Sequence, residues 1–253
     1  MNTAPTDLFR LDGKTAIVTG AARGLGAATA IMLAQRGARV AAVDLHWGDG
    51  DSPFGDPKEN ITTFIGDVSQ VAGMQALVAE IVAGFGRIDI LVNNAAICPR
   101  LPFYESTEAD WEKLMSVNAK SQYFLCQAVC RIMKNHGGGR IVNVASTGGR
   151  VGSFSNASIY CGTKGAIVMF TKSIAREVAA DGILVNCIAP GPMDTGLMRH
   201  LPPDRLSAVT DQIPLRRLGQ PEEVARLIAF MSSDAFSYAT GATYDVNGGW
   251  VML

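Results

Sequence analysis

A tyrosine and a lysine, Tyr160 and Lys164, stand four residues apart in a stretch whose apolar positions recur at helical spacing. Positions i and i+4 lie on one face of a helix, so both side chains can project in the same direction from a rigid element. A phenol with a pKa of about 10 exchanges protons poorly at neutral pH, whereas a cation held beside it favours the phenolate and lowers that pKa. The pair therefore predicts a general acid or base, although a surface Tyr–Lys pair has the same spacing.

Two polar residues elsewhere belong with this pair. Ser146 ends the apolar run RIVNVAS, a predicted strand, fourteen residues before Tyr160. Polar groups at the carboxyl edge of a parallel sheet stand where ligands bind. Asn118 lies inside a stretch predicted to be helical over 107–134, in one part or in two, where an asparagine is unfavourable by propensity. It is either an exposed helical residue or a residue kept for the site.

A glycine-rich turn near the start of the chain predicts a dinucleotide site. The β-branched run at 14–19, KTAIVT, reads as a buried parallel strand, and the turn GAARGLG and a helix follow it. Gly20, Gly24 and Gly26 suit a tight turn, a close backbone approach to a pyrophosphate and a helix N-terminus that attracts negative charge. A loop that needs glycine only for packing is the alternative, which the flanking strand and helix make less favourable.

The next strand, RVAAVD, ends at Asp44, and this residue predicts the choice of cofactor. It stands where a carboxylate accepts hydrogen bonds from both hydroxyls of the adenosine ribose. The same charge would repel a 2′-phosphate, so NAD is expected rather than NADP. Arg23 in the glycine turn argues the other way, because a basic side chain helps a phosphate bind. Leu45, and not an arginine, follows Asp44.

Strands and helices alternate along the remaining chain, which predicts an α/β fold with a parallel sheet. Further strands are predicted to end near Asp67, at Asn93-Asn94 and at Pro190-Gly191, and ATYDVNGG is the last. Residues 46–60 have no helical pattern and are expected to form a loop in place of a crossover helix. Residues 192–215 are expected to be an irregular, flexible lid over an apolar pocket, or else a surface loop with buried anchors.

Composition excludes several classes of protein. The 253 residues are 48% hydrophobic and 18% charged, enough for a sizeable core, and the net charge of -1 lacks the basic excess of a nucleic-acid-binding protein. No apolar run is long enough to span a membrane, and the first residues lack the apolar core of a secretory signal. The five cysteines contain no CxxC pair, which predicts reduced thiols in a cytoplasm. Because the three histidines are also scattered, we expect no metal site.

Taken together, the motifs resemble those of the short-chain dehydrogenase/reductase family over essentially the full length of the chain. The matching pieces are TGAARGLG at 19–26, Asp67-Val68, NNAA at 93–96, Asn118, Ser146, YCGTK at 160–164 and PGPMDT at 190–195. The resemblance implies a single domain of Rossmann type, a doubly wound sheet of about seven parallel strands with helices on both faces. It also implies a homotetramer.

The resemblance assigns chemical roles to four residues. Tyr160 would give a proton to a carbonyl oxygen in reduction, or take one from an alcohol in oxidation. Lys164 would lower the pKa of Tyr160 and bind the nicotinamide ribose, Ser146 would hold the substrate oxygen, and Asn118 would bind a water that relays protons from Lys164. The implied activity is hydride transfer between NAD(H) and a secondary alcohol or ketone.

The same resemblance implies a set of contacts. The expected cofactor contacts are Gly20, Arg23, Gly24, Leu25, Gly26, Asp44, Leu45, Asp67, Val68, Asn94, Ala95, Ala96, Tyr160, Lys164, Ile188, Pro190, Gly191, Met193 and Thr195, with the backbone at Asn93. The expected substrate pocket is Ile97, Cys98, Ser146, Gly148, Phe154, Tyr160, Met193, Leu197 and Met198. Arg150 would either meet an acidic substrate or remain a solvated loop residue. The mostly apolar pocket predicts a ketone or secondary alcohol of modest polarity.

Three departures from the family pattern stand out. Ala96 replaces a usual glycine, and the loop at 46–60 alters the adenosine rim. The interval from Ser146 to Tyr160 is one residue longer than common, which puts Thr147 at the usual spacing, where it could share the work of Ser146.

Three other functions stay open at the level of sequence. A 3-oxoacyl-carrier-protein reductase is the nearest alternative, but those enzymes usually use NADPH, against which Asp44 argues. An NAD-binding scaffold without activity would not need Tyr160 and Lys164. An epimerase or dehydratase on nucleotide sugars would need a larger carboxyl-terminal domain. Trp250 in the carboxyl tail either contacts another subunit or caps the core.

Overall fold

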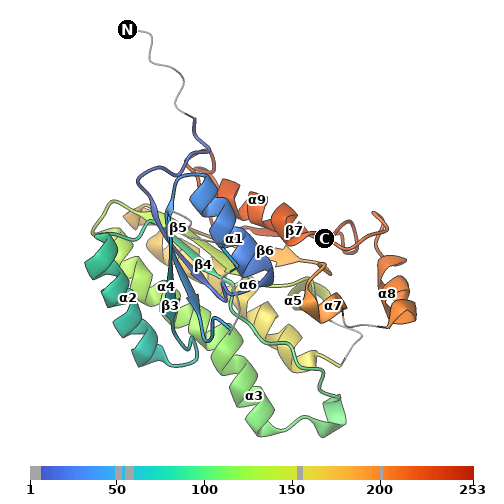
Figure 1. Ribbon diagram of the computed structural model, residues 1–253. Coiled ribbons are helices and arrows are strands. Elements are labelled where there is room, and N and C mark those ends of the chain that lie inside the picture. Colours follow the sequence, from blue (N-terminus) through green and yellow to red (C-terminus); the bar gives the residue numbers. More distant parts are fainter. Residues whose placement is uncertain (1–6, 49–52, 55–59, 153–155, 200–201) are drawn as a thin grey trace.

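The computed structural model describes residues 7–48, 53–54, 60–152, 156–199 and 202–253. Their strands form one parallel sheet of seven strands in the order β3-β2-β1-β4-β5-β6-β7 (Figure 1). The strands are β1 Thr15–Thr19, β2 Arg39–Asp44, β3 Ile61–Ile65, β4 Ile90–Asn93, β5 Gly139–Val144, β6 Ile183–Pro190 and β7 Thr243–Val246. The predicted Rossmann-type fold is confirmed.

Helices cover both faces of the sheet. The helices are α1 Gly24–Gln35, α2 Val71–Phe85, α3 Glu108–Leu114, α4 Ser121–Lys134, α5 Gly148–Val151, α6 Ser158–Val178, α7 Gly196–Arg199, α8 Pro203–Thr210 and α9 Pro221–Met231. One core cluster lies under α1 and α9, and a second lies under α2 and α4 and continues to α6 (Figure 1). In β1, Ala16 and Val18 face the first cluster and Ile17 faces the second, as the alternation of a strand requires.

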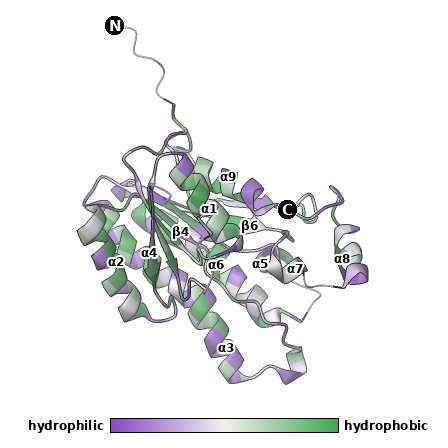
Figure 2. Ribbon diagram, viewed as in Figure 1, coloured by the Kyte–Doolittle hydropathy of each residue, from purple (hydrophilic) through white to green (hydrophobic). Residues whose placement is uncertain are grey.

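The central strands are hydrophobic along their whole length because both faces are covered. All five residues of β1 and all four of β4 are buried. The hydropathy colouring shows this as green strands in the middle of the molecule, with helices that are green on one side and purple on the other (Figure 2). The sheet edge at the carboxyl ends of these strands is therefore a rigid platform for the polar residues that follow them.

The connection from β2 to β3 contains no helix among the residues described there, 45–48, 53–54 and 60, as the sequence predicted. Trp47 and Phe54 contact each other with ring centroids 5.7 Å apart. Trp47 Nε1 donates a hydrogen bond to the main-chain oxygen of Phe64 at 3.1 Å, and Phe54 is 3% exposed. Aromatic packing thus attaches this connection to the sheet.

The helix predicted over 107–134 is divided by a π-helix. The capping box at Thr107 and Asp110 starts α3 as predicted. After α3 the chain forms a π-helix, Met115–Lys120, and then α4. Asn118 lies in the π-helix and is 0% exposed, so it is not an exposed helical asparagine. Such insertions disturb the regular helix and often occur at functional sites.

The segment 192–215 is not irregular, which corrects the sequence prediction. Its described residues include α7 and α8, and Met193 forms a β-bridge with Gly219. Pro203 fits the first turn of α8, where its missing N–H costs nothing. The role of this segment as a lid stays a prediction.

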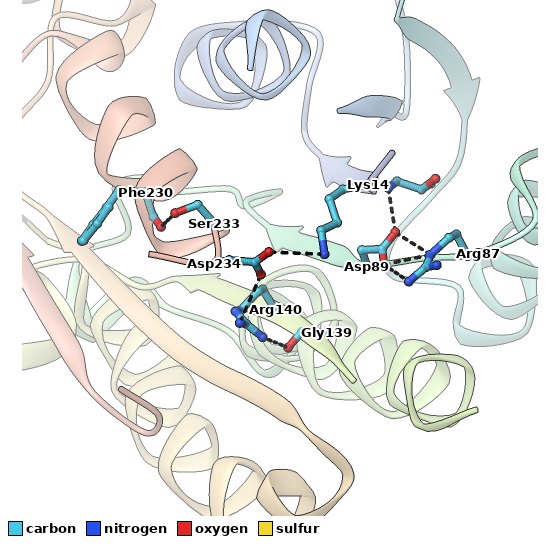
Figure 3. Close-up of polar contacts among 9 residues, drawn as sticks. Lys14, Arg87, Asp89, Gly139, Arg140, Phe230, Ser233 and Asp234 are labelled. Carbon is cyan, nitrogen blue, oxygen red and sulfur yellow. Dashed lines mark hydrogen bonds and ion pairs between the residues drawn. The ribbon is translucent and has the colours of Figure 1, made fainter. Parts of the chain in front are cut away.

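Charged residues gather at the amino-terminal edge of the sheet, opposite the predicted site (Figure 3). Asp234 lies 3.8 Å from Lys14 and 3.7 Å from Arg140. Asp89, 5% exposed, pairs with Arg87 and accepts a main-chain N–H at the start of β1 at 2.9 Å. These charges compensate one another and hold the starts of neighbouring strands together.

The described residues contain neither a membrane-spanning helix nor a cluster of metal ligands. No helix among them is long and apolar enough to cross a membrane. No three histidine, cysteine or acidic side chains among them come together as a metal site. All five cysteines are free thiols.

Candidate active site

Ser146 and Tyr160 meet at the carboxyl edge of the sheet. Ser146 follows the end of β5, and Tyr160 lies in the first turn of α6. Their hydroxyl groups share a hydrogen bond, and Ser146 Oγ also accepts the main-chain N–H of Gly148 at 3.1 Å. The two residues predicted to handle the substrate oxygen are therefore in contact.

Thr147 does not share the position of Ser146, although its sequence spacing is the more usual one. It is 3% exposed, and its Oγ1 donates a hydrogen bond to the main-chain oxygen of Pro190 at 3.3 Å. Its main-chain N–H donates to the same oxygen at 3.0 Å. Thr147 thus fastens the segment after β5 to the end of β6, and only Ser146 faces Tyr160.

Lys164 is buried one helical turn after Tyr160, with 1% of its surface exposed. Its Nζ donates a hydrogen bond to the main-chain oxygen of Val144 at 2.7 Å and lies 5.7 Å from the centroid of the Tyr160 ring. Burial lowers the pKa of Lys164 to about 8, because the ammonium loses its solvation. The predicted common face for the two side chains is present.

The direction of the Tyr160 pKa differs from the sequence prediction. Burial raises this pKa to about 12, while the hydrogen bond from Ser146 and the charge of Arg100 act in the opposite direction. Lys164 donates to a carbonyl and not to the phenol oxygen, so it does not offset the burial. The phenol is therefore held in its protonated form at neutral pH.

Asn118 connects the loop after β4 with α6. Its Oδ1 accepts the main-chain N–H of Ile97 at 2.9 Å, and its Nδ2 donates to the main-chain oxygen of Ile97 at 2.9 Å. Nδ2 also donates to Thr163 Oγ1 at 3.2 Å, next to Lys164 in sequence. The asparagine thus orients the site from inside the π-helix, and its role in a proton relay stays a prediction.

The glycine turn is built around Gly20 and Gly26. Asn94 Nδ2 donates to the main-chain oxygens of Thr19 and Gly20 at 2.9 and 3.0 Å, and Thr19 Oγ1 accepts the N–H groups of Asn94 and Ala95. A Cβ at Gly20 would lie 2.8 Å from the Ala95 Cα, and one at Gly26 would overlap the Gly20 oxygen. These two glycines are required by backbone packing, as the packing interpretation supposed.

The start of α1 fits the pyrophosphate of a dinucleotide. Gly24 has a φ of +55°, and a Cβ there would meet only the methyl group of Thr195, at 3.6 Å. Arg23 caps the helix without a side-chain hydrogen bond, and the first turn contains no acidic residue. Backbone N–H groups of this turn are thus left for an anionic ligand, opposite the predicted contact Thr195.

Asp44 lies beside the same turn. Its Oδ2 accepts the main-chain N–H of Ala22 at 2.9 Å and its Oδ1 that of Leu45 at 2.7 Å. The exposed Leu45 continues the rim. Asp67, after β3, accepts the N–H of Ser69 at 2.9 Å. Asp44 ends β2 and Asp67 follows the adjacent strand β3, at the edge of the sheet where an adenosine would be bound. The residues present therefore fit a nicotinamide dinucleotide.

The remaining predicted contacts are distributed as follows. Leu25, Val68 and Ile188 are buried, Ala96 is exposed, and Pro190 and Gly191 end β6. Gly148 lies at Tyr160, because a Cβ there would be 3.9 Å from Tyr160 Cε1. Met193 pairs with Gly219, and Met198 is 8% exposed. Phe154 and the side chain of Leu197 lie outside the described part of the chain.

The structure adds residues that sequence reasoning missed. Cys161 lies beside Gly148, where a Cβ would be 3.0 Å from its Sγ. The charge of Arg100 acts on Tyr160, whereas the sequence indicated only Arg150 as a charge near the substrate. Arg150 instead pairs with Asp245. The spacing of the motifs carries no signal for these contacts, because they join segments that are distant in sequence.

Comparisons with known proteins agree with this geometry. A family model described as enoyl-(acyl carrier protein) reductase matches residues 20–251. The 3-oxoacyl-[acyl-carrier-protein] reductase of Vibrio cholerae is 39% identical over 97% of this chain and 100% of its own. The chain belongs to the short-chain dehydrogenase/reductase family. It is an oxidoreductase of that family, whose members bind a nicotinamide cofactor and act on small molecules.

Relatives within the family differ in their named activities. The D-threitol dehydrogenase of Mycolicibacterium smegmatis is 38% identical over 96% of this chain and 95% of its own. A crystal structure from Sinorhizobium meliloti, described as a short-chain alcohol dehydrogenase, superposes with a TM-score of 0.89 at 33% identity and covers 96% of this chain and 98% of its own. Membership in the family therefore fixes the fold and the reaction class.

Replacing Gly149 with alanine tests how tightly the site is packed. A Cβ there would lie 2.5 Å from the main-chain carbon of Lys164, so α5 must move away from α6 and carry Ser146 with it. We expect unfolding stability to fall by about 1–3 kcal/mol, and turnover to fall further than the loss of folded protein explains. The control is Gly162→Ala, where a Cβ meets nothing within 4 Å. Equal effects of the two variants on chemical denaturation and turnover would contradict this packing.

Replacing Lys164 with methionine should stabilise the protein while abolishing its activity. The folded state keeps a buried ammonium with a pKa of about 8, against 10.5 for the ordinary lysine, so its cost is fully present below pH 8. At pH 7 we expect a gain of about 1–3 kcal/mol, less than the pKa alone implies because the bond to Val144 is lost. The gain should shrink as pH rises from 8 towards 10.5. In this range Lys164 of the unaltered protein loses its proton when folded but keeps it when unfolded, so the cost of the buried charge disappears. Urea denaturation at several pH values measures it, with the exposed Lys172→Met as the control.

Proposed function

We propose that this protein interconverts a secondary alcohol and a ketone with NAD(H) as the hydride carrier. The observation that carries the proposal is the contact between Ser146 and Tyr160, with Lys164 buried one helical turn later. It lies at the same edge of the parallel sheet as the glycine turn, whose Ala22 N–H is bound by Asp44. The nicotinamide, when bound, supplies or accepts the hydride. Every other requirement of the reaction falls to the residues of the chain.

Proton transfer is assigned to Tyr160. In reduction, negative charge develops on the carbonyl oxygen, and two hydroxyl donors in contact can stabilise it while Tyr160 gives up its proton. The raised pKa keeps Tyr160 protonated at neutral pH, which suits proton donation. Oxidation needs the phenolate, so the alcohol reaction should gain rate as pH rises. To Lys164, one helical turn after Tyr160, we assign a part in returning the proton, and it would hold a ribose hydroxyl of the bound cofactor.

The assignment of NAD is supported by the carboxylate of Asp44. Hydrogen bonds from the main-chain N–H groups of Ala22 and Leu45 hold the carboxylate in place. It would therefore stay near a 2′-phosphate and repel it. The second candidate is a 3-oxoacyl reductase that uses NADPH. It is favoured by the 39% identity to the Vibrio cholerae enzyme and by the exposed Arg23 in the turn. A substrate of modest polarity, a homotetrameric assembly and a cytoplasmic location stay predictions.

Replacing Tyr160 with phenylalanine should abolish turnover without preventing cofactor binding. Loss of a general acid typically costs 10²–10⁴-fold in rate, so we expect kcat to fall by at least about 100-fold. The assay is nicotinamide absorbance with NAD or NADP and a panel of secondary alcohols, polyols and ketones. Cofactor affinity, measured by fluorescence titration, should change little. A variant that turns over as fast as the unaltered protein would remove Tyr160 from the mechanism.

Replacing Asp44 with alanine should weaken the preference for NAD. Removal of one charge near the 2′-phosphate should raise the ratio of NADP to NAD efficiency by about tenfold to hundredfold, or about 1.4–2.8 kcal/mol. Asp67→Ala is the matched control, because it removes a carboxylate from the adjacent strand end while leaving the 2′ position alone. An unchanged ratio in the Asp44 variant would exclude this residue as the selectivity determinant.

A further inference from the structure

The segment after β5 that carries Ser146 is too short to be stable without contacts to other elements. It continues into α5, a helix of four residues, whereas isolated helices shorter than roughly 12–15 residues are marginal in water. Contacts with other elements must therefore place it. Two of these involve backbone: Thr147 N–H donates to the main-chain oxygen of Pro190 at 3.0 Å, and Gly149 lies against the backbone of Lys164.

The third contact is an ion pair between side chains. Arg150 Nη2 lies 3.2 Å from Asp245 Oδ2, and the two side chains are only 19% and 21% exposed. The other oxygen, Asp245 Oδ1, is buried and has no hydrogen-bond partner among the described residues. The carboxylate is thus largely withdrawn from water. Loss of Arg150 would leave this charge without compensation, which is costly for a partly buried group.

Asp245 belongs to β7, and β7 is paired with the strand that leads to the predicted nicotinamide contacts. Ala189 of β6 is in register with Asp245, and Pro190 with Val246. The N–H of Gly191 donates to the main-chain oxygen of Val246 at 2.9 Å. The ion pair therefore joins the segment of Ser146 to the strand pair that carries the turn at Pro190-Gly191.

We propose that Arg150 and Asp245 form a positioning pair that fixes Ser146 relative to the Pro190-Gly191 turn, and so aligns the substrate oxygen with the cofactor at Tyr160. The effect on turnover rests on the proposed function, whereas the effect on the segment itself rests on the contacts alone. The pair touches no reacting atom. Its chemical importance comes from geometry, since a displacement of about 1 Å can cost about 100-fold in rate.

The test compares Arg150→Met, Asp245→Asn, the double variant and Arg150→Lys in the full-length protein. Each single variant should lower kcat by about tenfold or more with a smaller change in the KM for cofactor. The double variant should be no slower than the slower single variant, because either substitution alone already breaks the ion pair. Arg150→Lys, which keeps the charge, should recover activity to within about threefold of the unaltered protein.

A readout that needs no substrate accompanies the kinetics. Hydrogen exchange, followed by mass spectrometry, should accelerate in the peptide covering 146–152 in Arg150→Met and Asp245→Asn. Lys134→Met is the matched control, because it breaks the ion pair of Lys134 with Asp181, 3.0 Å apart, at the ends of α4 and of the turn before β6. It should leave both exchange in 146–152 and kcat unchanged.

The outcomes separate the two proposals. Unchanged exchange in 146–152, or additive effects of the two substitutions on kcat, would overturn the positioning pair. Faster exchange with full activity would overturn it as well, because the segment would then move without consequence. If Tyr160→Phe keeps full activity while exchange in 146–152 responds as expected, the proposed function fails and the structural link between Arg150 and Asp245 stands.

Discussion

The site depends on a lysine ammonium placed in the interior of the protein. Lys164 is 1% exposed, and the main-chain oxygen of Val144 accepts its hydrogen bond at 2.7 Å. A buried charge is costly, so its partner has to be fixed. Val144 ends a strand that is paired on both sides, and it is itself in register with Ile188 of β6. Ser146 follows the same strand two residues later. One strand end therefore sets the position of the cation and of the hydroxyl, and α6 brings Tyr160 to them.

Two halves of the sheet contribute different parts of the site. The half with β1, β2 and β3 presents the glycine turn and Asp44, held together by Thr19, Asn94 and the Ala22 N–H. The half with β5, β6 and β7 presents Ser146 and the Pro190-Gly191 turn. β4 lies between them, and its following loop is tied to the glycine turn on one side and to Asn118 on the other. A dinucleotide laid across this edge would meet rigid groups at both ends.

Local features of the sequence predicted much of this arrangement. The parallel α/β fold follows from the alternation of strands and helices along the chain. The glycine turn and the shared face of Tyr160 and Lys164 follow from short-range spacing, because each depends on a single turn or helix. The pKa of Tyr160 was wrongly predicted, since its direction depends on how deeply the assembled protein buries the ring. The bond from Thr147 to Pro190 and the pair of Arg150 with Asp245 could not be predicted, because they join segments about 40 and 95 residues apart.

The helical insertion at Asn118 and the short helices within 192–215 escaped prediction for a related reason. Both depend on tertiary contacts that outweigh local propensity. Asn118 is bound to Ile97 and Thr163, on two other elements. Met193 is paired with Gly219.

Asp44 has a double attachment that bears on how such a protein changes its cofactor during evolution. The carboxylate accepts the Ala22 N–H within the glycine turn and the Leu45 N–H beyond the strand. A substitution that removes its charge therefore also loosens the turn on which any dinucleotide would rest. Proteins that evolve a different cofactor selectivity at this position would have to replace the lost hydrogen bonds elsewhere in the turn. A change of selectivity by one substitution should therefore be rarer than a change by two.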